Sequence, residues 1–481
     1  MRSGKLGMLK NIIHLFYSTI FANLLNAMSL IVLANFLGAK NYGMFSVSLG
    51  VTMIMFFFTD LGISNTFLQE GVKQEENFNI LVSSYVKSRI IFLIVNCIIC
   101  YVGIHIFYNE KEFVNILEGL LFSMLIGLTL QSIGVTYFQL IEEMKYIAAI
   151  KIFAAVFLMI ITIVCAYFQF KPYVTVFLYG LAYIIGGINS LYLVCRKIKL
   201  QLNGAWQKQL FHQLVPFLMS GLLIMIIPQL GPIILKHTLS FTLIGIFMVA
   251  YRIPAALYQM PGVIAGAFFP VLFRNFSQND IEKHTKLNIL QMKCMTIVGM
   301  GTTIFIYYFA PYFISILFDS EWDQAVLPLK ILAFLIVLQS INIAIADGLT
   351  TKGQQMRRTM IQFLVLIVGG IAFYILSLAY GINGAAYAAI LLEIVALVGY
   401  IAVNEIRMKI IKEVIIPYMC YFCFPFVVIQ YILGTYVVIA MILNVILIVV
   451  LIFTLDRDMK KLIIDGIEKI RKRNSLIRQG T

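Results

Sequence analysis

A single arginine, Arg252, interrupts a membrane-length apolar run from Phe241 to Phe273. At about 1.5 Å per residue it lies roughly 17 Å along a helix that begins at Phe241, near the middle of an apolar layer about 30 Å thick. An arginine at that depth costs about 2.5–3.5 kcal/mol, so it needs a partner, a water-filled cavity or a functional reason. We expect Arg252 to face a polar cavity through which an anionic group passes. The alternative is an ion pair with a carboxylate on a neighbouring helix.

Proline residues are concentrated in the same part of the chain. Six of the 11 prolines lie here: Pro216, Pro228, Pro232, Pro254, Pro261 and Pro270. Each removes a backbone hydrogen bond and costs about 3 kcal/mol inside a regular helix. Lipid cannot satisfy the freed carbonyls, whereas water or a neighbouring helix can. These helices are therefore expected to be kinked, either statically or as a moving element.

One carboxylate, Glu393, is predicted at a depth similar to that of Arg252, about ten residues into its span. Because burial disfavours the charged form, Glu393 is a candidate to carry a proton or a sodium ion. The alternative is a structural ion pair with Arg252 or Lys330. Asp60 and Asp347 lie near the cytosolic ends of their spans and are weaker candidates for ion coupling.

Three polar residues of the first span are further candidates for contact with a substrate. Lys10 and His14 open this span on the cytosolic side, where Lys10 either meets an anionic group or extends to the membrane surface. Asn26 is the deepest asparagine of the span. It is equally suited to binding a hydroxyl-rich ligand and to hydrogen bonding with a neighbouring helix.

The composition indicates a polytopic helical membrane protein. Of 481 residues, 61% are hydrophobic and 12% charged, and the mean hydropathy is +0.94. Apolar runs of about 20 residues recur along almost the whole chain. The first run is too long for a signal peptide and is expected to be retained. Fourteen spans are predicted, at 11–37, 42–62, 80–107, 113–138, 146–168, 174–195, 210–235, 241–273, 287–318, 325–349, 359–379, 383–403, 413–433 and 437–455.

The formal charge of +14 follows from topology and does not indicate nucleic-acid binding. Most of the 36 Lys and Arg residues lie in segments on one side of the predicted membrane, whereas the opposite loops hold only Lys40, Lys111, Lys171 and Lys236. The positive-inside rule therefore predicts that both termini lie in the cytosol. The basic tail at 456–481 is expected to be a cytosolic helix or to touch anionic lipid.

The chain contains an internal repeat. An offset of 202 residues pairs Ser18 with Ser220, Leu33 with Leu235, Leu37 with Leu239, Gly43 with Gly245, Phe45 with Phe247 and Val47 with Val249. The tetrapeptide LQSI at 130–133 recurs at 338–341. Six spans repeated as six form a parallel repeat, and such halves in transporters rock about a central site. We predict two parallel six-helix bundles around a central cavity (1–205 and 206–405), two appended helices (406–455) and the tail.

The sequence contains few features that are typical of an enzyme. The predicted outer loops are too short for a catalytic domain, and no phosphate-binding G-x-x-x-x-G-K-[ST] motif occurs. The two C-x-x-C pairs, Cys97/Cys100 and Cys420/Cys423, lie inside apolar runs, where a redox or zinc role lacks charge and access. We therefore expect no catalytic site, no cofactor and no metal.

Several motifs in this order resemble those of a known family. LGAKNYGMFSVSLG (37–50) and FTDLGISNTFLQE (58–70) look like the opening signature of the polysaccharide transporters, the Wzx-type oligosaccharide flippases. IGIFMVAYRIPAALYQMPGVIAGAFFPVLF (244–273) is similar to the stretch that opens their second half. LFDSEWDQAVLPLKILA (317–333) and YGINGAAYAAILLE (380–393) are similar to two later signatures. Their superfamily also contains multidrug extruders and the lipid II flippase.

The resemblance implies that the chain moves a polyprenyl-diphosphate-linked oligosaccharide to the outer leaflet for capsule, exopolysaccharide or O-antigen synthesis. Because a guanidinium donates two parallel bonds to phosphate, Arg252 becomes the leading substrate residue, with Lys10 and Asn26 behind it. The expected partners are this lipid-linked glycan, membrane lipid, H⁺ or Na⁺ as coupling ion, and polysaccharide assembly enzymes. The alternatives are a cation-coupled multidrug exporter of the same superfamily and, less favoured, a membrane glycan polymerase or ligase.

Overall fold

The computed structural model describes the backbone of residues 5–71, 78–201, 206–211, 221–223, 225–257, 259–456 and 459–460. The side chains of residues 5–17 lie outside this description. Within the described residues all regular structure is helical, and ten helices are long and apolar enough to cross a membrane. This confirms the predicted all-α, multi-pass membrane fold.

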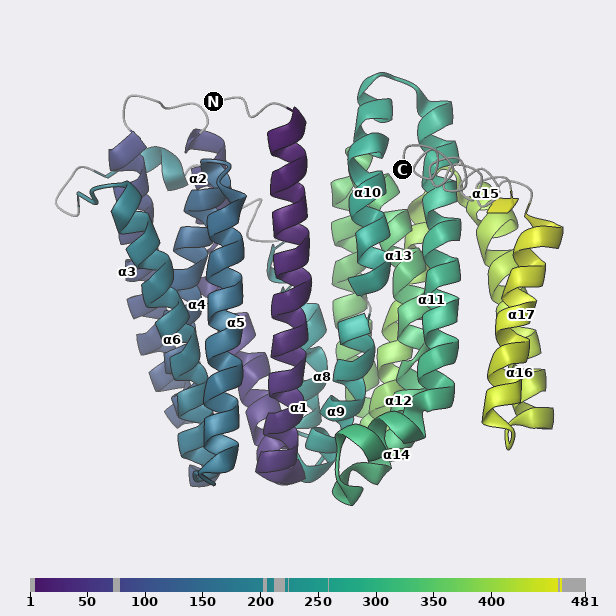
Figure 1. Ribbon diagram of the computed structural model, residues 1–481, viewed down its shortest axis with the longest axis horizontal. Helices are drawn as coiled ribbons and strands as arrows, with labels where there is room; N and C mark the ends of the chain where they lie inside the picture. The colour runs from purple at the N-terminus through teal and green to yellow at the C-terminus, as the bar shows by residue number, and fades with distance from the viewer. Residues whose placement is uncertain are drawn as a thin grey trace, which may run out of the picture. The chain divides into compact units, whose positions relative to one another are not determined.

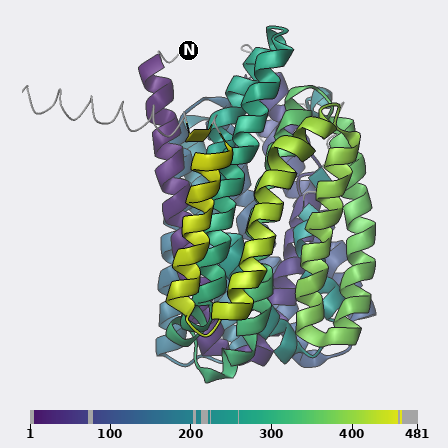
Figure 2. The same ribbon diagram turned by 90° about the vertical axis from the view of Figure 1, so that its right-hand side faces the viewer.

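Two of the ten helices are each double, so the ten together cover twelve of the fourteen predicted spans. Helix α1 (Lys5–Phe58) is interrupted at Gly38, and α14 (Gln355–Val403) at Gly381. Their φ values of 70° and 59° fall in the left-handed region, which glycine adopts without a Cβ clash. In α14 a methyl group on Gly384 would lie 1.8 Å from the Leu376 carbonyl oxygen, so the chain folds back on itself there. Figure 2 shows the two limbs of α14 side by side.

The chain divides into two compact units. The first contains residues 1–249 and 317–322, and the second contains residues 250–316 and 323–481. The spans predicted as an appended pair (406–455) belong to the second unit. The predicted repeat boundaries at 205 and 405 do not coincide with this division and stay a prediction. The basic tail lies outside the described residues except at Asp456, Met459 and Lys460.

The first unit is built on long helices that run side by side (Figure 1). It contains α1, α2 (Ile63–Gly71), α3 (Phe78–Phe107), α4 (Lys111–Leu140), α5 (Met144–Tyr167), α6 (Pro172–Lys197), η1 (Lys208–Phe211), η2 (Ile227–Gln229), α8 (Leu230–Leu235) and the first half of α9 (Phe241–Leu257). Small residues let α4 and α6 approach closely, because a methyl group on Gly127 would lie 2.2 Å from the Tyr183 carbonyl carbon.

The core and the surface of this unit are both apolar, as expected for a helix bundle in lipid. Phe67, Tyr85 and Phe138 are buried in one cluster where α2, α3 and α4 meet. On the outside of α3, Ile98 and Ile99 are about three-fifths exposed, at 60% and 61%. Exposed apolar side chains at this density mark a membrane-facing surface.

The second unit continues with α10 (Gln259–Ser277), α11 (Ile281–Leu317), η3 (Ser320–Ala325), α12 (Val326–Leu332), α13 (Phe334–Thr351) and α14. It ends with α15 (Arg407–Ile410), the π-helical turn η4 (Ile411–Cys420), α16 (Tyr421–Leu433) and α17 (Val437–Leu455). Helices α16 and α17 pair as a hairpin, which Figure 2 shows in yellow.

A buried ion pair ties the end of α17 to α11. The Lys293 ammonium lies 2.8 Å from the Asp456 carboxylate, and both side chains are over nine-tenths buried. Tyr418 and the Met459 amide also donate to this carboxylate, at 2.8 and 3.0 Å. Burial alone would raise the pKa of Asp456, but these donors outweigh it and hold the pKa below its ordinary value. The stability contributed by Asp456 is therefore present above the ordinary carboxyl pKa and is lost as the pH falls below it.

We predict that Lys293→Met lowers the free energy of unfolding by about 3–5 kcal/mol, because it leaves a buried carboxylate without its counter-ion. The measurement is the thermal unfolding midpoint of the detergent-solubilised protein. Lys286→Met is the matched control, since Lys286 pairs with Glu282 at an exposed position and should change the midpoint little. A midpoint for Lys293→Met equal to that of the control would contradict the anchoring role.

Candidate functional site

Arg252 lies in α9 with its side chain half-buried. Its Nε is buried and has no hydrogen-bond partner, and no carboxylate pairs with its guanidinium among the described residues. The alternative to the expected polar cavity, an ion pair with a neighbouring helix, is thus not formed among the described residues. A buried donor without an acceptor carries a desolvation penalty. The guanidinium is accordingly free to bind an external anion.

The backbone around Arg252 contains a proline that allows α9 to bend. The division between the two compact units falls between Val249 and Ala250. Pro254 lies inside α9, and a proline has no amide proton to donate to the carbonyl four residues earlier, which here belongs to Ala250. Arg252 therefore lies between Ala250, whose carbonyl lacks its helical hydrogen bond, and Pro254, which cannot donate that bond.

Glu393 on α14 is held by two amide side chains of α13. Gln339 Nε2 donates to one carboxylate oxygen at 2.9 Å, and Asn342 Nδ2 donates to the other at 2.7 Å. Asn342 also donates to the Glu393 backbone carbonyl at 2.9 Å. Neither Arg252 nor Lys330 forms an ion pair with Glu393 in the part of the chain that the structure describes; Lys330 instead lies 5.5 Å from the Tyr307 ring centre. The Glu393 carboxylate is thus hydrogen-bonded to two uncharged amide groups and not to a cation.

The same cluster contains an unused acceptor. Asn342 is 5% exposed, and its Oδ1 is buried without a hydrogen-bond partner. If the amide turns over, this oxygen can accept the O–H of a protonated Glu393. The cluster can therefore donate hydrogen bonds to the charged carboxylate or, after the amide turns, accept one from the neutral carboxyl group. That is the chemistry required of a proton-carrying residue.

Asp60 has a different environment from the one expected for an ion-coupling residue. It follows the end of α1 and forms an ion pair with Arg89 of α3, which is fully buried. Arg89 also donates to Ser132 of α4. This network joins three helices and holds the backbone turn at Leu61 and Gly62, where φ is 50° and 85°. The geometry favours a structural role for Asp60.

Asp347 lies in α13 and is 9% exposed. Gln291 Nε2 of α11 donates to its carboxylate at 2.7 Å. Asn288, one turn earlier, donates to the Ala344 carbonyl at 2.8 Å. Asp347 thus belongs to a polar seam between α11 and α13, separate from the Glu393 cluster.

The remaining predicted substrate residues lie on α1. The Lys10 side chain falls outside the described residues. Asn26 is half-buried, and no hydrogen bond of its side chain is formed within the described part of the chain. Its amide is therefore available to a ligand, and Glu393 and Asp347 belong to the other compact unit.

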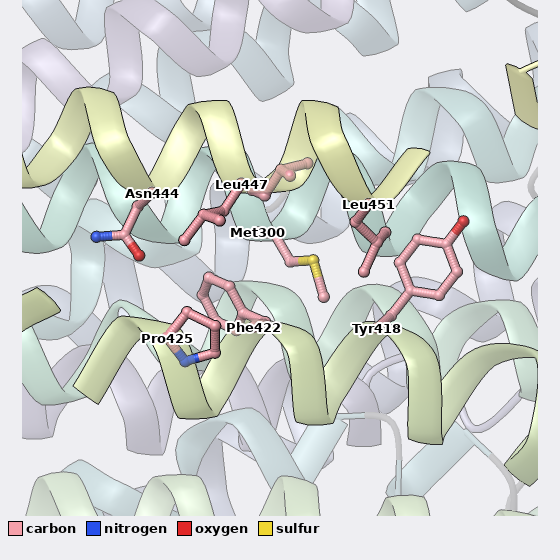
Figure 3. A pocket seen from close by; sticks show the side chains of 8 residues that line it. Met300, Tyr418, Phe422, Pro425, Asn444, Leu447 and Leu451 are labelled. Atoms are coloured by element: carbon pink, nitrogen blue, oxygen red, sulfur yellow. The ribbon is translucent and has the colours of Figure 1, made fainter. Parts of the chain in front are cut away.

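A small cavity of about 10 Å³ lies among α11, η4, α16 and α17. Figure 3 shows Asn444 and Leu451 on one side, Tyr418 and Pro425 on the other, and Met300 between them. Its walls are mostly apolar, and Asn444 Nδ2 donates to the Tyr308 hydroxyl at 3.1 Å. With no charged lining residue, the cavity is unsuited to binding an ion.

The family described as "Polysaccharide biosynthesis protein" matches residues 8–276, which is more than half of the chain. The chain belongs to this family. The match covers α1 through most of α10 and includes Asp60, Arg89 and Arg252. No curated protein sequence is similar enough to match the chain.

Members of two other transporter groups have the same fold as this chain. The lipid II flippase MurJ in an inward closed conformation has a TM-score of 0.70 at 13% identity, over 93% of this chain and 99% of the other. An inward-facing multidrug resistance MATE family transporter of the MOP superfamily also has a TM-score of 0.70, at 14% identity, over 84% and 98%. A MOP superfamily transporter from Pyrococcus furiosus, described as having a binding pocket of reversed polarity, has a TM-score of 0.59 at 15% identity, over 86% and 100%.

Sequence reasoning missed the residues that surround the predicted ones. Gln339 and Asn342 are three residues apart in α13, and this spacing places two amides on one face of a helix. That signal was present but ambiguous, because polar residues at such spacing also join helices in membranes. Only the packing of α3 shows that Arg89 is buried.

We predict that Glu393→Ala lowers the free energy of unfolding by about 1–3 kcal/mol, because Gln339 loses its buried acceptor. Glu393→Gln should cost less, since its side-chain oxygen still accepts and its amide can donate to Asn342 Oδ1. Thermal unfolding of the two variants in detergent measures the difference. Equal midpoints would show that the amides find other partners.

Proposed function

We propose that this protein is a flippase that moves a polyprenyl-diphosphate-linked oligosaccharide from the cytosolic to the outer leaflet of the bacterial plasma membrane. The observation that carries the proposal is the unpaired guanidinium of Arg252 inside an apolar helix. Membership of a polysaccharide biosynthesis family and a fold shared with a lipid II flippase support it.

The substrate class follows from the chemistry that Arg252 offers. A lipid-linked glycan has a diphosphate at the membrane surface, a polar sugar chain and an apolar tail that can remain in lipid. Two parallel charge-assisted bonds from a guanidinium suit the diphosphate, while amides such as Asn26 suit sugar hydroxyls. Lys10 on the cytosolic side is the expected first contact for the diphosphate.

The driving ion is proposed to act at Glu393. Its two amide donors stabilise the carboxylate, and the unused Asn342 Oδ1 can accept the proton of the neutral form. On proton uptake, the Asn342 amide can turn over and exchange its donated hydrogen bonds for one that it accepts from the neutral carboxyl group. This arrangement favours H⁺ over Na⁺, because the contacts to the carboxylate are donors and a sodium site needs several oxygen ligands.

The alternative is a cation-coupled multidrug exporter, which the MATE-like fold and the buried carboxylate favour. Such a carrier binds cationic substrates, and an unpaired arginine in its path would repel them. A strain that lacks this gene distinguishes the two functions. Accumulation of lipid-linked repeat units, relieved by this chain, supports the flippase; unchanged repeat-unit levels with increased drug sensitivity support the exporter.

We predict that Arg252→Ala abolishes polymer export and that Arg252→Lys retains part of it. Loss of the charged bonds to phosphate, about 1.5–3 kcal/mol, corresponds to roughly 10- to 150-fold weaker binding. The measurement is exported polymer per unit of membrane-inserted protein. Arg274→Ala, at an exposed position at the end of α10, is the matched control and should export normally. Normal export by Arg252→Ala would reject the assignment.

We predict that Glu393→Gln uncouples transport from the ion gradient, because an amide cannot take up and release a proton. Export by this variant should be slow and should no longer respond to collapse of the proton gradient. Glu405→Gln, which changes an exposed carboxylate just beyond the end of α14, serves as control. Retention of the full gradient dependence by Glu393→Gln would exclude the coupling role.

A further inference from the structure

Two glycines bring α1 and α9 into backbone contact. A methyl group on Gly43 would lie 1.8 Å from the Phe241 carbonyl oxygen, and one on Gly245 would lie 2.1 Å from the Ala39 carbonyl oxygen. Each would also lie within about 3 Å of the other glycine's amide nitrogen, at 3.0 and 3.1 Å. No side chain fits between these two helices at the crossing.

The contact is reciprocal under the sequence repeat. An offset of 202 residues converts Gly43 into Gly245 and Ala39 into Phe241. The contact of Gly43 with Phe241 is thereby converted into the contact of Gly245 with Ala39. A contact that maps onto itself when its partners are exchanged is the mark of a two-fold axis. The crossing therefore lies where an internal two-fold relation between the repeats brings equivalent helices together.

Further contacts join the same two regions of the sequence. Next to the bend at Gly38, the Ala39 amide donates to Glu321 Oε1 at 3.1 Å, and Asn35 Nδ2 donates to the Leu317 carbonyl at 2.7 Å. Trp322, 1% exposed, packs edge-on against Tyr42 with ring centres 5.8 Å apart. These contacts explain why residues 317–322 belong to the first compact unit.

The turn between α8 and α9 is fastened to the first repeat as well. The Lys236 ammonium lies 3.6 Å from the Tyr108 ring centre and 3.9 Å from that of Phe113. Phe241 stacks on Phe113 with ring centres 5.1 Å apart. All of these residues lie in or beside the loops predicted to be outside the cell, at 38–41, 108–112, 236–240 and 319–324.

We propose that the crossing of Gly43 and Gly245 is the outer closure of the transport path, and that it must separate in every cycle. The proposal rests on the proposed function and on its predicted orientation. Backbones in direct contact leave no room for water or sugar between them. Contact without interlocking side chains also lets the helices part as rigid bodies, and α9 can bend at Ala250, where Pro254 removes a hydrogen bond.

The test measures access from outside the cell to a reporter cysteine. In a cysteine-free chain, Val47→Cys places a thiol one turn from Gly43 on the same helix face, at a position that is 1% exposed. A membrane-impermeant maleimide is added to intact cells. Gly43→Ala and Gly245→Ala should each raise the labelling rate roughly tenfold, because the added methyl groups force the helices apart.

Gly103→Ala is the matched control, since a methyl group there meets nothing within 4 Å and should leave labelling unchanged. Glu321→Ala is the second variant. It removes one exposed carboxylate and no buried packing, so it folds even if an alanine at the crossing does not, and it should raise labelling by a smaller factor. If Glu321→Ala and every glycine variant that reaches the membrane at normal levels label at the control rate, the proposal is overturned.

The labelling experiment needs no substrate, so it is independent of the export assay. A labelling response in a chain that fails to relieve repeat-unit accumulation would leave the closure intact and reject the flippase. Normal export with no labelling response in any variant would have the opposite meaning: the flippase would stand, and the outer closure would lie elsewhere.

Discussion

Inside an apolar bundle, every polar group must find its partner within the chain, because lipid offers none. Most of the charged groups buried in this protein obey that constraint. Arg89 pairs with Asp60, Lys293 pairs with Asp456, and the Glu393 carboxylate accepts from Gln339 and Asn342. Arg252 does not obey it: its Nε is buried without an acceptor among the described residues. Arg89 also has an Nε without an acceptor, but it keeps its ion pair with Asp60, whereas no carboxylate pairs with Arg252 among the described residues. The function proposed here follows from that unpaired charge, since a cation left unpaired by the fold is available to an anion from outside it.

Glycine residues permit backbone conformations and backbone contacts that other residues would prevent. At Gly38 and Gly381 it permits backbone angles that turn one helix into two spans. At Gly43 and Gly245 it permits two backbones to touch. The same absence of a side chain therefore serves two purposes, tight turns at the ends of spans and close contact without interdigitation. A contact of the second kind can be made and broken without repacking side chains, which a moving closure requires.

The family and the fold place these features in a common context. The chain belongs to a polysaccharide biosynthesis family, and the lipid II flippase and a MATE transporter share its fold at 13% and 14% identity. At that distance the fold is shared while side chains differ. The polarity of the site must therefore be taken from this chain's own residues. An unpaired arginine in α9 and an amide-held carboxylate in α14 support the proposal of a carrier for an anionic substrate whose cycle is linked to proton transfer.

The sequence by itself determined the membrane-spanning helical architecture, because apolar length depends only on consecutive residues. It also located Arg252 and Glu393 as unusual, since a charge in an apolar run is visible without coordinates. Only the tertiary structure decided which charges are paired: Arg89 and Asp60 are 29 residues apart, and Gln339 and Glu393 are 54 apart. The same holds for the reciprocal contact of Gly43 and Gly245, whose equivalence the repeat suggested but whose meeting it could not reveal. Partner choice depends on how helices pack, and packing involves residues too far apart in the chain for periodicity to relate them.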